Sequence, residues 1–167
     1  MKKTAVFISA IAGTLFFSSC GPTQKDATAY NDKLVAIEKS ATDIHNMYID
    51  QLDGHNPDSL KMIYEQFSAK VKASEEECKN MEDFNKKKDF ADAAAAYFAT
   101  MGGLLQKEGK EMTEIAAKDS SQITEADITK FNELVTKFDE VYGKSLEKVQ
   151  AAQTAFAKEW KFEVKTE

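Results

Sequence analysis

Apolar residues recur at steps of three and four along four long segments of this 167-residue chain. This spacing places apolar side chains on one face of an α-helix, whereas a strand would show a period of two. Seven glycines and two prolines are also too few turn-forming residues for a many-stranded barrel or sandwich. The sequence therefore predicts an all-α protein whose aromatic side chains fill the space between helices. The four stripes are Tyr30, Leu34, Ile37, Ala41, Ile44 and Tyr48; Leu60, Ile63, Phe67, Val71, Ser74, Cys78 and Met81; Phe90, Ala94, Tyr97, Met101, Leu104, Glu108, Met112 and Ile115; and Ile128, Phe131, Val135, Phe138, Tyr142, Ser145, Val149, Ala152, Phe156 and Trp160.

Turn-forming residues and helix caps separate the first from the second segment and the third from the fourth. The run at 53–57 interrupts the apolar pattern. Asn56 is the expected N-cap of the second helix, and Pro57 takes its first position, where a missing amide hydrogen costs nothing. Residues 119–122 are typical of a loop, and Thr124 after them is the expected N-cap of the fourth helix.

The connection between the second and third helices is less clearly marked. Residues 84–89 contain three consecutive lysines, and Asp89 is the expected N-cap of a helix from about Phe90 to Ala117. The pair Gly102-Gly103 inside that helix is expected to mark a kink or a close approach between helices. Four helices with short connections predict an antiparallel up-down-up-down four-helix bundle. A three-helix arrangement is the alternative if the chain stays helical through 84–89.

The first 20 residues have the pattern of an export signal and not of a folded domain. Lys2 and Lys3 precede the apolar run 5–17, which is too short to span a bilayer. The sequence FSSCG at 17–21 resembles the lipobox read by lipoprotein signal peptidase. This resemblance implies cleavage before Cys20 and a diacylglycerol on the sulfur of Cys20.

The lipobox divides the chain into three expected parts: a signal peptide at 1–19, a lipidated cysteine with a polar linker at 20–28, and a helical bundle domain at 29–167. Loss of the signal peptide removes two lysines and changes the net charge from −6 to −8. Gly21 stands where an aspartate would imply retention in the inner membrane, so the resemblance implies the outer membrane. The sequence QKD at 24–26 resembles a signal for surface display, but a solvated tether explains it equally well. The periplasmic face and the cell surface therefore both stay open.

Four short motifs resemble those of a family of uncharacterised bacterial surface lipoproteins. The most specific is AQTAFAK at 152–158, which is followed by the aromatic ending WKF at 160–162. The resemblance covers most of the chain after Cys20 and implies a helical, membrane-anchored protein. It transfers no activity and no catalytic residue. The other motifs are AYND at 29–32, DAA at 92–94 and ITEAD at 123–127.

No residue pattern in the sequence predicts catalysis, a metal centre or a cofactor. A di-iron bundle needs a glutamate three residues before a histidine, whereas Thr42 and Leu52 occupy those positions before His45 and His55. No Cys-x-x-Cys-His motif for covalent haem is present. Cys78 lies on an apolar stripe, so we expect a buried, unreactive thiol with a raised pKa. We expect His45 to be a partly exposed helix residue and His55 to be exposed in a turn.

These observations predict a membrane-anchored envelope lipoprotein with a binding or structural role and no enzymatic activity. Its expected partners are the lipid bilayer, through the acylated Cys20, and another envelope protein on an exposed helix face. The acidic net charge and the absence of arginine argue against nucleic acid. The alternative function is a carrier or sensor that holds a small apolar molecule or haem within the bundle. Small residues at 93–96, 102–103 and 143 motivate this alternative because they leave room between helices.

Overall fold

The chain is helical through most of the part that the computed structural model describes, residues 21–54 and 56–164. No strand occurs among these residues, and a single isolated bridge pairs Phe84 with Lys87. The all-α prediction is confirmed. The predicted signal peptide, the lipidation site Cys20 and the turn residue His55 lie outside the described residues. The elements are α1 (Gln24–Leu52), α2 (Pro57–Lys79), α3 (Asp89–Leu104), the π-helix η1 (Leu105–Gly109), α4 (Lys110–Ala116), the 3₁₀-helix η2 (Ser120–Gln122) and α5 (Glu125–Trp160).

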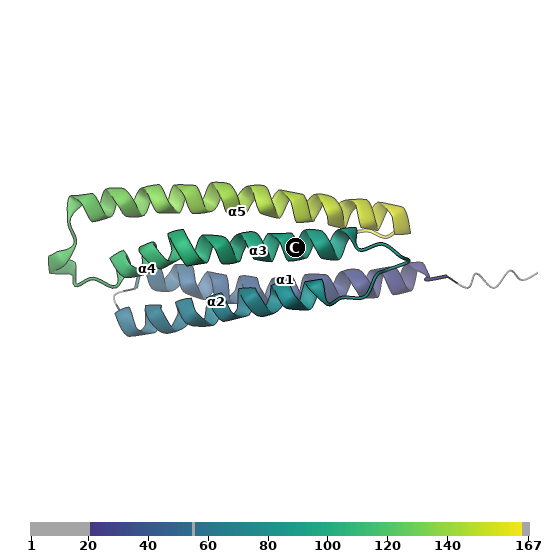
Figure 1. The fold of residues 1–167 in the computed structure, drawn as a ribbon, viewed down its shortest axis with the longest axis horizontal. Helices are drawn as coiled ribbons and strands as arrows, with labels where there is room; N and C mark the ends of the chain where they lie inside the picture. The colour runs from purple at the N-terminus through teal and green to yellow at the C-terminus, as the bar shows by residue number, and fades with distance from the viewer. Residues whose placement is uncertain (1–20, 55, 165–167) are drawn as a thin grey trace, which may run out of the picture.

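Four long helical bodies lie side by side along the longest axis of the molecule (Figure 1). One of them is composite, because α3, η1 and α4 follow one another without a break. The helix α1 packs against α2, α2 against α3, and α3 against α5, whereas the seam between α1 and α5 is much less extensive. Residues 80–88 are not helical, so the three-helix alternative is wrong.

The apolar stripes are the faces that the helices bury against one another. Phe67 and Leu60 of α2 are fully buried, as is Tyr48 of α1. The stripe of α5 is less completely buried: Phe138, Ser145 and Val149 are buried, whereas Ile128 near its start is 54% exposed. The core also includes Leu34, Ile37, Val71, Cys78, Phe90, Tyr97, Phe98, Met101, Leu105, Met112, Leu134, Phe138 and Val149.

Two of the three predicted N-caps are confirmed. The Asn56 side chain accepts a hydrogen bond from the Ser59 amide at 3.0 Å, with Pro57 in the first helical position. Thr124 caps α5 through a capping box with Asp127. The third prediction is wrong, because Asp89 is already the first residue of α3 and Lys88 before it forms no side-chain cap. Asp89 instead places its negative charge in the first turn, where the helix dipole favours it.

The helix α1 begins earlier than the apolar pattern predicts. Thr23 and Asp26 form a capping box in which the Thr23 amide donates to the Asp26 carboxylate at 2.8 Å. This cap starts the helix at Gln24, and Ala27 on its first turn is fully buried. Residues 24–28, predicted to be linker, are therefore helical, and among the described residues only 21–23 precede the helix.

A tight turn reverses the chain between α2 and α3. Phe84 and Lys87 exchange two backbone hydrogen bonds, at 2.8 and 3.0 Å. The two residues between them, Asn85 and Lys86, have φ angles of 52° and 65°. Two consecutive left-handed residues define a type I′ turn, which normally favours Asn and Gly. The turn aims the Phe84 side chain at aromatic residues of α1 and α5.

Candidate functional site

The helix α1 begins and α5 ends at the same end of the bundle, which we call the base (Figure 1). The Gln24 side-chain amide donates a hydrogen bond to the Lys161 backbone carbonyl, and Lys87 forms an ion pair with Glu159 at 2.7 Å. Only three residues separate Gln24 from Cys20, and four residue steps span at most about 14 Å of extended chain. A lipid on Cys20 would therefore hold the base close to a membrane.

Six aromatic side chains pack together at the base and form what we call the basal cluster. The Phe156 ring of α5 is central, with its centroid 5.5 Å from that of Tyr30 and 5.7 Å from that of Phe90. Phe84 packs edge-on against both Phe156 and Trp160, at 5.4 and 4.9 Å. The cluster thus joins α1, the α2–α3 turn, α3 and α5. Its members are Tyr30, Phe84, Phe90, Phe156, Trp160 and Phe162.

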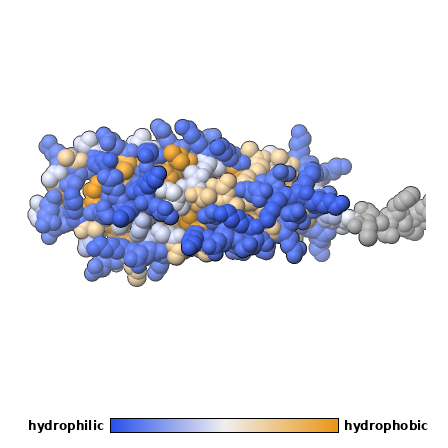
Figure 2. Space-filling model, viewed as in Figure 1, coloured by the Kyte–Doolittle hydropathy of each residue, from blue (hydrophilic) through white to orange (hydrophobic). Residues whose placement is uncertain are grey.

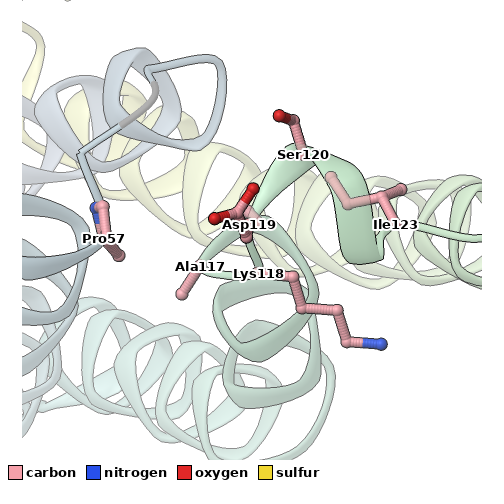
Figure 3. Close-up of a pocket in the computed structure, with 7 residues that line it drawn as sticks. Pro57, Ala117, Lys118, Asp119, Ser120 and Ile123 are labelled. Atoms are coloured by element: carbon pink, nitrogen blue, oxygen red, sulfur yellow. The ribbon is translucent and has the colours of Figure 1, made fainter.

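The opposite end of the bundle, which we call the tip, contains a pocket of about 630 Å³. The pocket lies between Pro57, at the start of α2, and the connection from α4 to α5. Ala117 and Asp119 lie on the side of the connection that faces Pro57, whereas the Lys118 side chain extends away (Figure 3). The pocket therefore forms where the two loops of the tip meet.

Apolar side chains are also exposed at the tip, on the connection from α4 to α5 and at the start of α5. Ile123, which lines the pocket, is 38% exposed, and Ile128 in the first turn of α5 is more exposed still. The connection is held by an ion pair between Lys118 and Asp127 at 2.5 Å. This ion pair, together with the hydrogen bonds from Thr124, lowers the pKa of Asp127 to about 2. Asp127 is therefore ionised at neutral pH, and the isoleucines are presented on an ordered surface.

His45 is partly exposed, as predicted, and its ring packs among aromatic rings from two other helices. Its ring stacks on Phe67 of α2 with centroids 5.2 Å apart and contacts Tyr142 of α5 at 5.3 Å. Phe138 of α5 lies at 6.2 Å. Burial lowers the pKa of His45, and the nearby Asp139 carboxylate acts in the opposite direction. The arrangement makes His45 a packing residue of the seam between α1 and α5.

Polar residues of α1 recur at intervals of seven: Asn31, Glu38 and His45. The Gln153 side chain of α5 donates a hydrogen bond to the Asn31 side-chain oxygen at 2.9 Å. Glu38 forms no salt bridge within the described residues, and burial raises the pKa of its carboxyl group. The seam between α1 and α5 is therefore less extensive than the other three contacts between the long helices, and two polar residues of α1, Asn31 and His45, contact α5 across it.

We expect the stability of the bundle to fall as the pH decreases below about 6.5, because the folded state keeps His45 neutral. Over the window between that value and the lowered pKa of His45, the unfolded chain binds a proton that the folded chain does not. The free energy of unfolding, measured by urea titration at a series of pH values, should therefore decrease through this window. The variant His45→Gln should weaken this pH dependence, and an unchanged slope would contradict the assignment to His45.

Cys78 is fully buried, as its position on the apolar stripe of α2 predicts. Burial raises the pKa of its thiol to about 12, with smaller contributions from Glu77 and Glu38. Ser74, one turn earlier, is also fully buried, and its hydroxyl has no hydrogen-bond partner in the structure. Neither side chain is presented to solvent as a nucleophile.

The π-helix η1 is a feature that the sequence analysis missed. The Tyr48 hydroxyl donates to the Gly109 carbonyl at 3.0 Å, and the Tyr64 hydroxyl donates to the Leu105 carbonyl at 3.0 Å. The hydroxyl of Thr113 also lies 3.0 Å from that of Tyr48. Hydroxyl groups from α1, α2 and α4 thus bind both ends of the irregular turn, where carbonyl groups are displaced from regular α-helical pairing. Its only hint in the sequence is Tyr48, a tyrosine on the apolar stripe of α1, because Tyr64 lies beside the stripe of α2 and is half-buried.

The small residues of α3, η1 and α5 differ in how closely neighbouring side chains approach them. An added Cβ atom would meet nothing within 4 Å at Gly103 or Gly143, and only the Val71 side chain, at 3.8 Å, at Gly102. The glycine pair therefore marks no close helix approach. Gly109 is the tighter position, because an added Cβ would lie 3.1 Å from the Leu105 side chain. The alanines at 93 and 96 line a solvent-open groove between α3 and α5.

The described residues offer no recognised centre for metal chemistry. Within 21–54 and 56–164, no three His, Cys, Asp or Glu side chains are grouped so that they could hold a metal ion. In the same part of the chain, no helix is both long and apolar enough to cross a membrane. No protein-family model, curated protein or solved structure matches the chain.

Proposed function

We propose that this protein is a lipid-anchored lipoprotein of the bacterial outer membrane with a non-catalytic binding or structural role. The mature chain begins at Cys20, which carries the lipid, and the signal peptide 1–19 is removed. The observation that carries this proposal is the short chain between the lipobox cysteine and the capped first turn of α1. A stable helix that starts four residues after the cysteine leaves the bundle little freedom to move away from the membrane.

The bundle has an antiparallel up-down-up-down topology in this proposal, and it stands with its base toward the bilayer. Contacts of Gln24 with Lys161 and of Lys87 with Glu159 support this orientation, because they join the first turn of α1 and the α2–α3 turn to the end of α5. The tip then faces away from the membrane. Since α5 has 36 residues, the tip would stand about 50 Å from the base.

The tip is the surface that meets a partner, which we propose is another protein of the envelope. Its support is the combination of a pocket beside Pro57 with the exposed side chains of Ile123 and Ile128. An exposed apolar side chain that lines a pocket, as Ile123 does, favours an interaction surface. The resemblance to surface lipoproteins leaves the periplasmic face and the cell surface as two locations for this contact.

The experiment that tests the anchor compares the two cysteines of the chain. Cells producing the protein are fed an alkyne-tagged fatty acid, and the purified protein is examined for the tag and for its intact mass. Wild type and Cys78→Ala should carry the tag and lack residues 1–19. Cys20→Ala should carry no tag and keep the signal peptide. A wild-type protein without lipid, or with another N-terminus, would overturn the proposal.

A further inference from the structure

A groove of about 400 Å³ runs along the surface between α3 and α5. Its floor is built from small and apolar side chains, and Tyr97, which is only 3% exposed, reaches it from the core. Figure 2 shows a face of the bundle on which hydrophobic and near-neutral residues lie between hydrophilic ones. The groove is lined by Ala93, Ala96, Tyr97, Thr100, Val141, Lys144, Ser145 and Lys148.

The charged residues of the groove all have one sign. Lys144 and Lys148 lie one turn apart on α5, both are exposed, and neither forms a salt bridge within the described residues. No acidic residue lines the groove, although the chain as a whole has a net charge of −6. An apolar floor beside two free ammonium groups is complementary to a molecule with an apolar tail and one anionic head.

Two further features narrow the ligand class. Lysine offers a point charge and not the planar guanidinium with which arginine forms bidentate hydrogen bonds to phosphate. The two ammonium groups therefore need no bidentate partner, and one carboxylate on the ligand is sufficient to pair with them. The stretch from Ala93 to Thr100 rises about 10 Å along α3, which gives the floor the elongated form of an extended acyl chain.

We propose that the groove between α3 and α5 binds a medium-chain fatty acid, with the carboxylate at Lys144 and Lys148 and the acyl chain on the floor at Ala93 and Ala96. This inference goes beyond the proposed anchor and partner role. It does not require a lipid on Cys20, because the groove is built entirely from residues of α3 and α5.

The test uses the full chain in discs of zwitterionic phosphatidylcholine and a photoreactive twelve-carbon fatty acid as the probe. After illumination and trypsin digestion, mass spectrometry should locate crosslinks on peptide 89–107 of α3 and on peptides 138–144 and 145–148 of α5. Excess laurate should compete with the probe, whereas acetate and dodecyltrimethylammonium should not. Equal competition by dodecyltrimethylammonium, or crosslinks confined to the basal cluster or the tip, would overturn the proposal.

Three variants separate the apolar and the charged parts of the site. Ala96→Leu fills the floor at an exposed helical position and should abolish crosslinking at these peptides without unfolding the bundle. The pair Lys144→Gln with Lys148→Gln removes two trypsin sites, so α5 is then followed as the single peptide 138–158. Crosslinking to this peptide and to 89–107 should fall about threefold to tenfold, as expected for two exposed charge interactions. The matched pair Lys33→Gln with Lys61→Gln lowers the same charge elsewhere and should have no effect. Equal losses in both lysine pairs would show only nonspecific attraction and would overturn the proposal.

Discussion

Replacement of Tyr48 by alanine is expected to lower the free energy of unfolding by about 3–5 kcal/mol. Tyr48 is fully buried, packs against Phe67 and Tyr64, and binds the end of the π-helix at Gly109. Its removal leaves a large cavity and removes one of the two hydroxyl groups that donate to the Gly109 carbonyl, the other being that of Thr113. Because natural domains are stable by only about 5–15 kcal/mol, this single change removes a large fraction of the total. Urea denaturation followed by circular dichroism measures the loss.

The variant Tyr48→Phe separates the hydroxyl group from the ring. It keeps the packing but loses the contacts with Gly109 and Thr113, so we expect a loss of about 1–2 kcal/mol. Tyr64→Phe is the matched control at the other end of η1, where a half-buried hydroxyl binds Leu105, and it should cost less. If Tyr48→Phe is as stable as the wild type, its hydroxyl does not hold the π-helix in place.

The second large effect is expected at the centre of the basal cluster. Phe156→Ala removes the ring that contacts Tyr30, Phe84 and Phe90, and should lower the free energy of unfolding by about 3 kcal/mol. We place the loss at the lower end for a core aromatic because Phe156 is partly exposed. The change should also be visible in the fluorescence of Trp160, the single tryptophan, which packs against Phe84 and Phe156.

Met62→Ala provides a control for the Phe156 variant. Met62 is an exposed apolar residue of α2, so its truncation should change the free energy of unfolding by less than about 0.5 kcal/mol. The emission of Trp160 should shift toward longer wavelength in Phe156→Ala and stay unchanged in Met62→Ala. A Phe156→Ala protein with wild-type stability would show that the basal cluster contributes little to holding α5 against its neighbours.

The helices and most of their ends could be predicted because local sequence determines them. The stripes follow from helical spacing, and the caps at Asn56 and Thr124 depend on side chains only three residues from the groups they bind. The early start of α1 was available to the same logic through Thr23 and Asp26. The apolar pattern alone does not show this boundary, because the first residue of the stripe, Tyr30, lies about two turns after the cap at Thr23.

Features that depend on several helices could not be predicted from the chain alone. The π-helix requires hydroxyl groups of Tyr48 and Tyr64, which come from two other helices. The ring neighbours of His45 likewise belong to α2 and α5, so its place in the seam follows from packing and not from its own sequence context. The small residues at 93–96 are the only sign of the groove between α3 and α5 in the sequence, because Lys144 and Lys148 join them only through the packing of α5 against α3.

If the bundle is anchored as proposed, its two ends have different roles. The base, closed by aromatic residues, lies next to the predicted lipid, and the tip carries the pocket and the exposed isoleucines. In the proposed arrangement, a bundle of this length displays the proposed partner surface well away from the bilayer while its base stays close to it. The groove opens along the side of α3 and α5, which leaves both ends free for these roles.

The orientation of the bundle on a membrane tests this account most directly. A fluorophore is attached at Glu82→Cys, at the base, or at Ser121→Cys, at the tip, in the lipidated Cys78→Ala protein on vesicles that carry an energy acceptor in their headgroups. With the tip about 50 Å from the base, the fluorophore at residue 82 should be strongly quenched and that at residue 121 only weakly. Equal quenching at both positions, or stronger quenching at residue 121, would contradict an upright bundle held by Cys20.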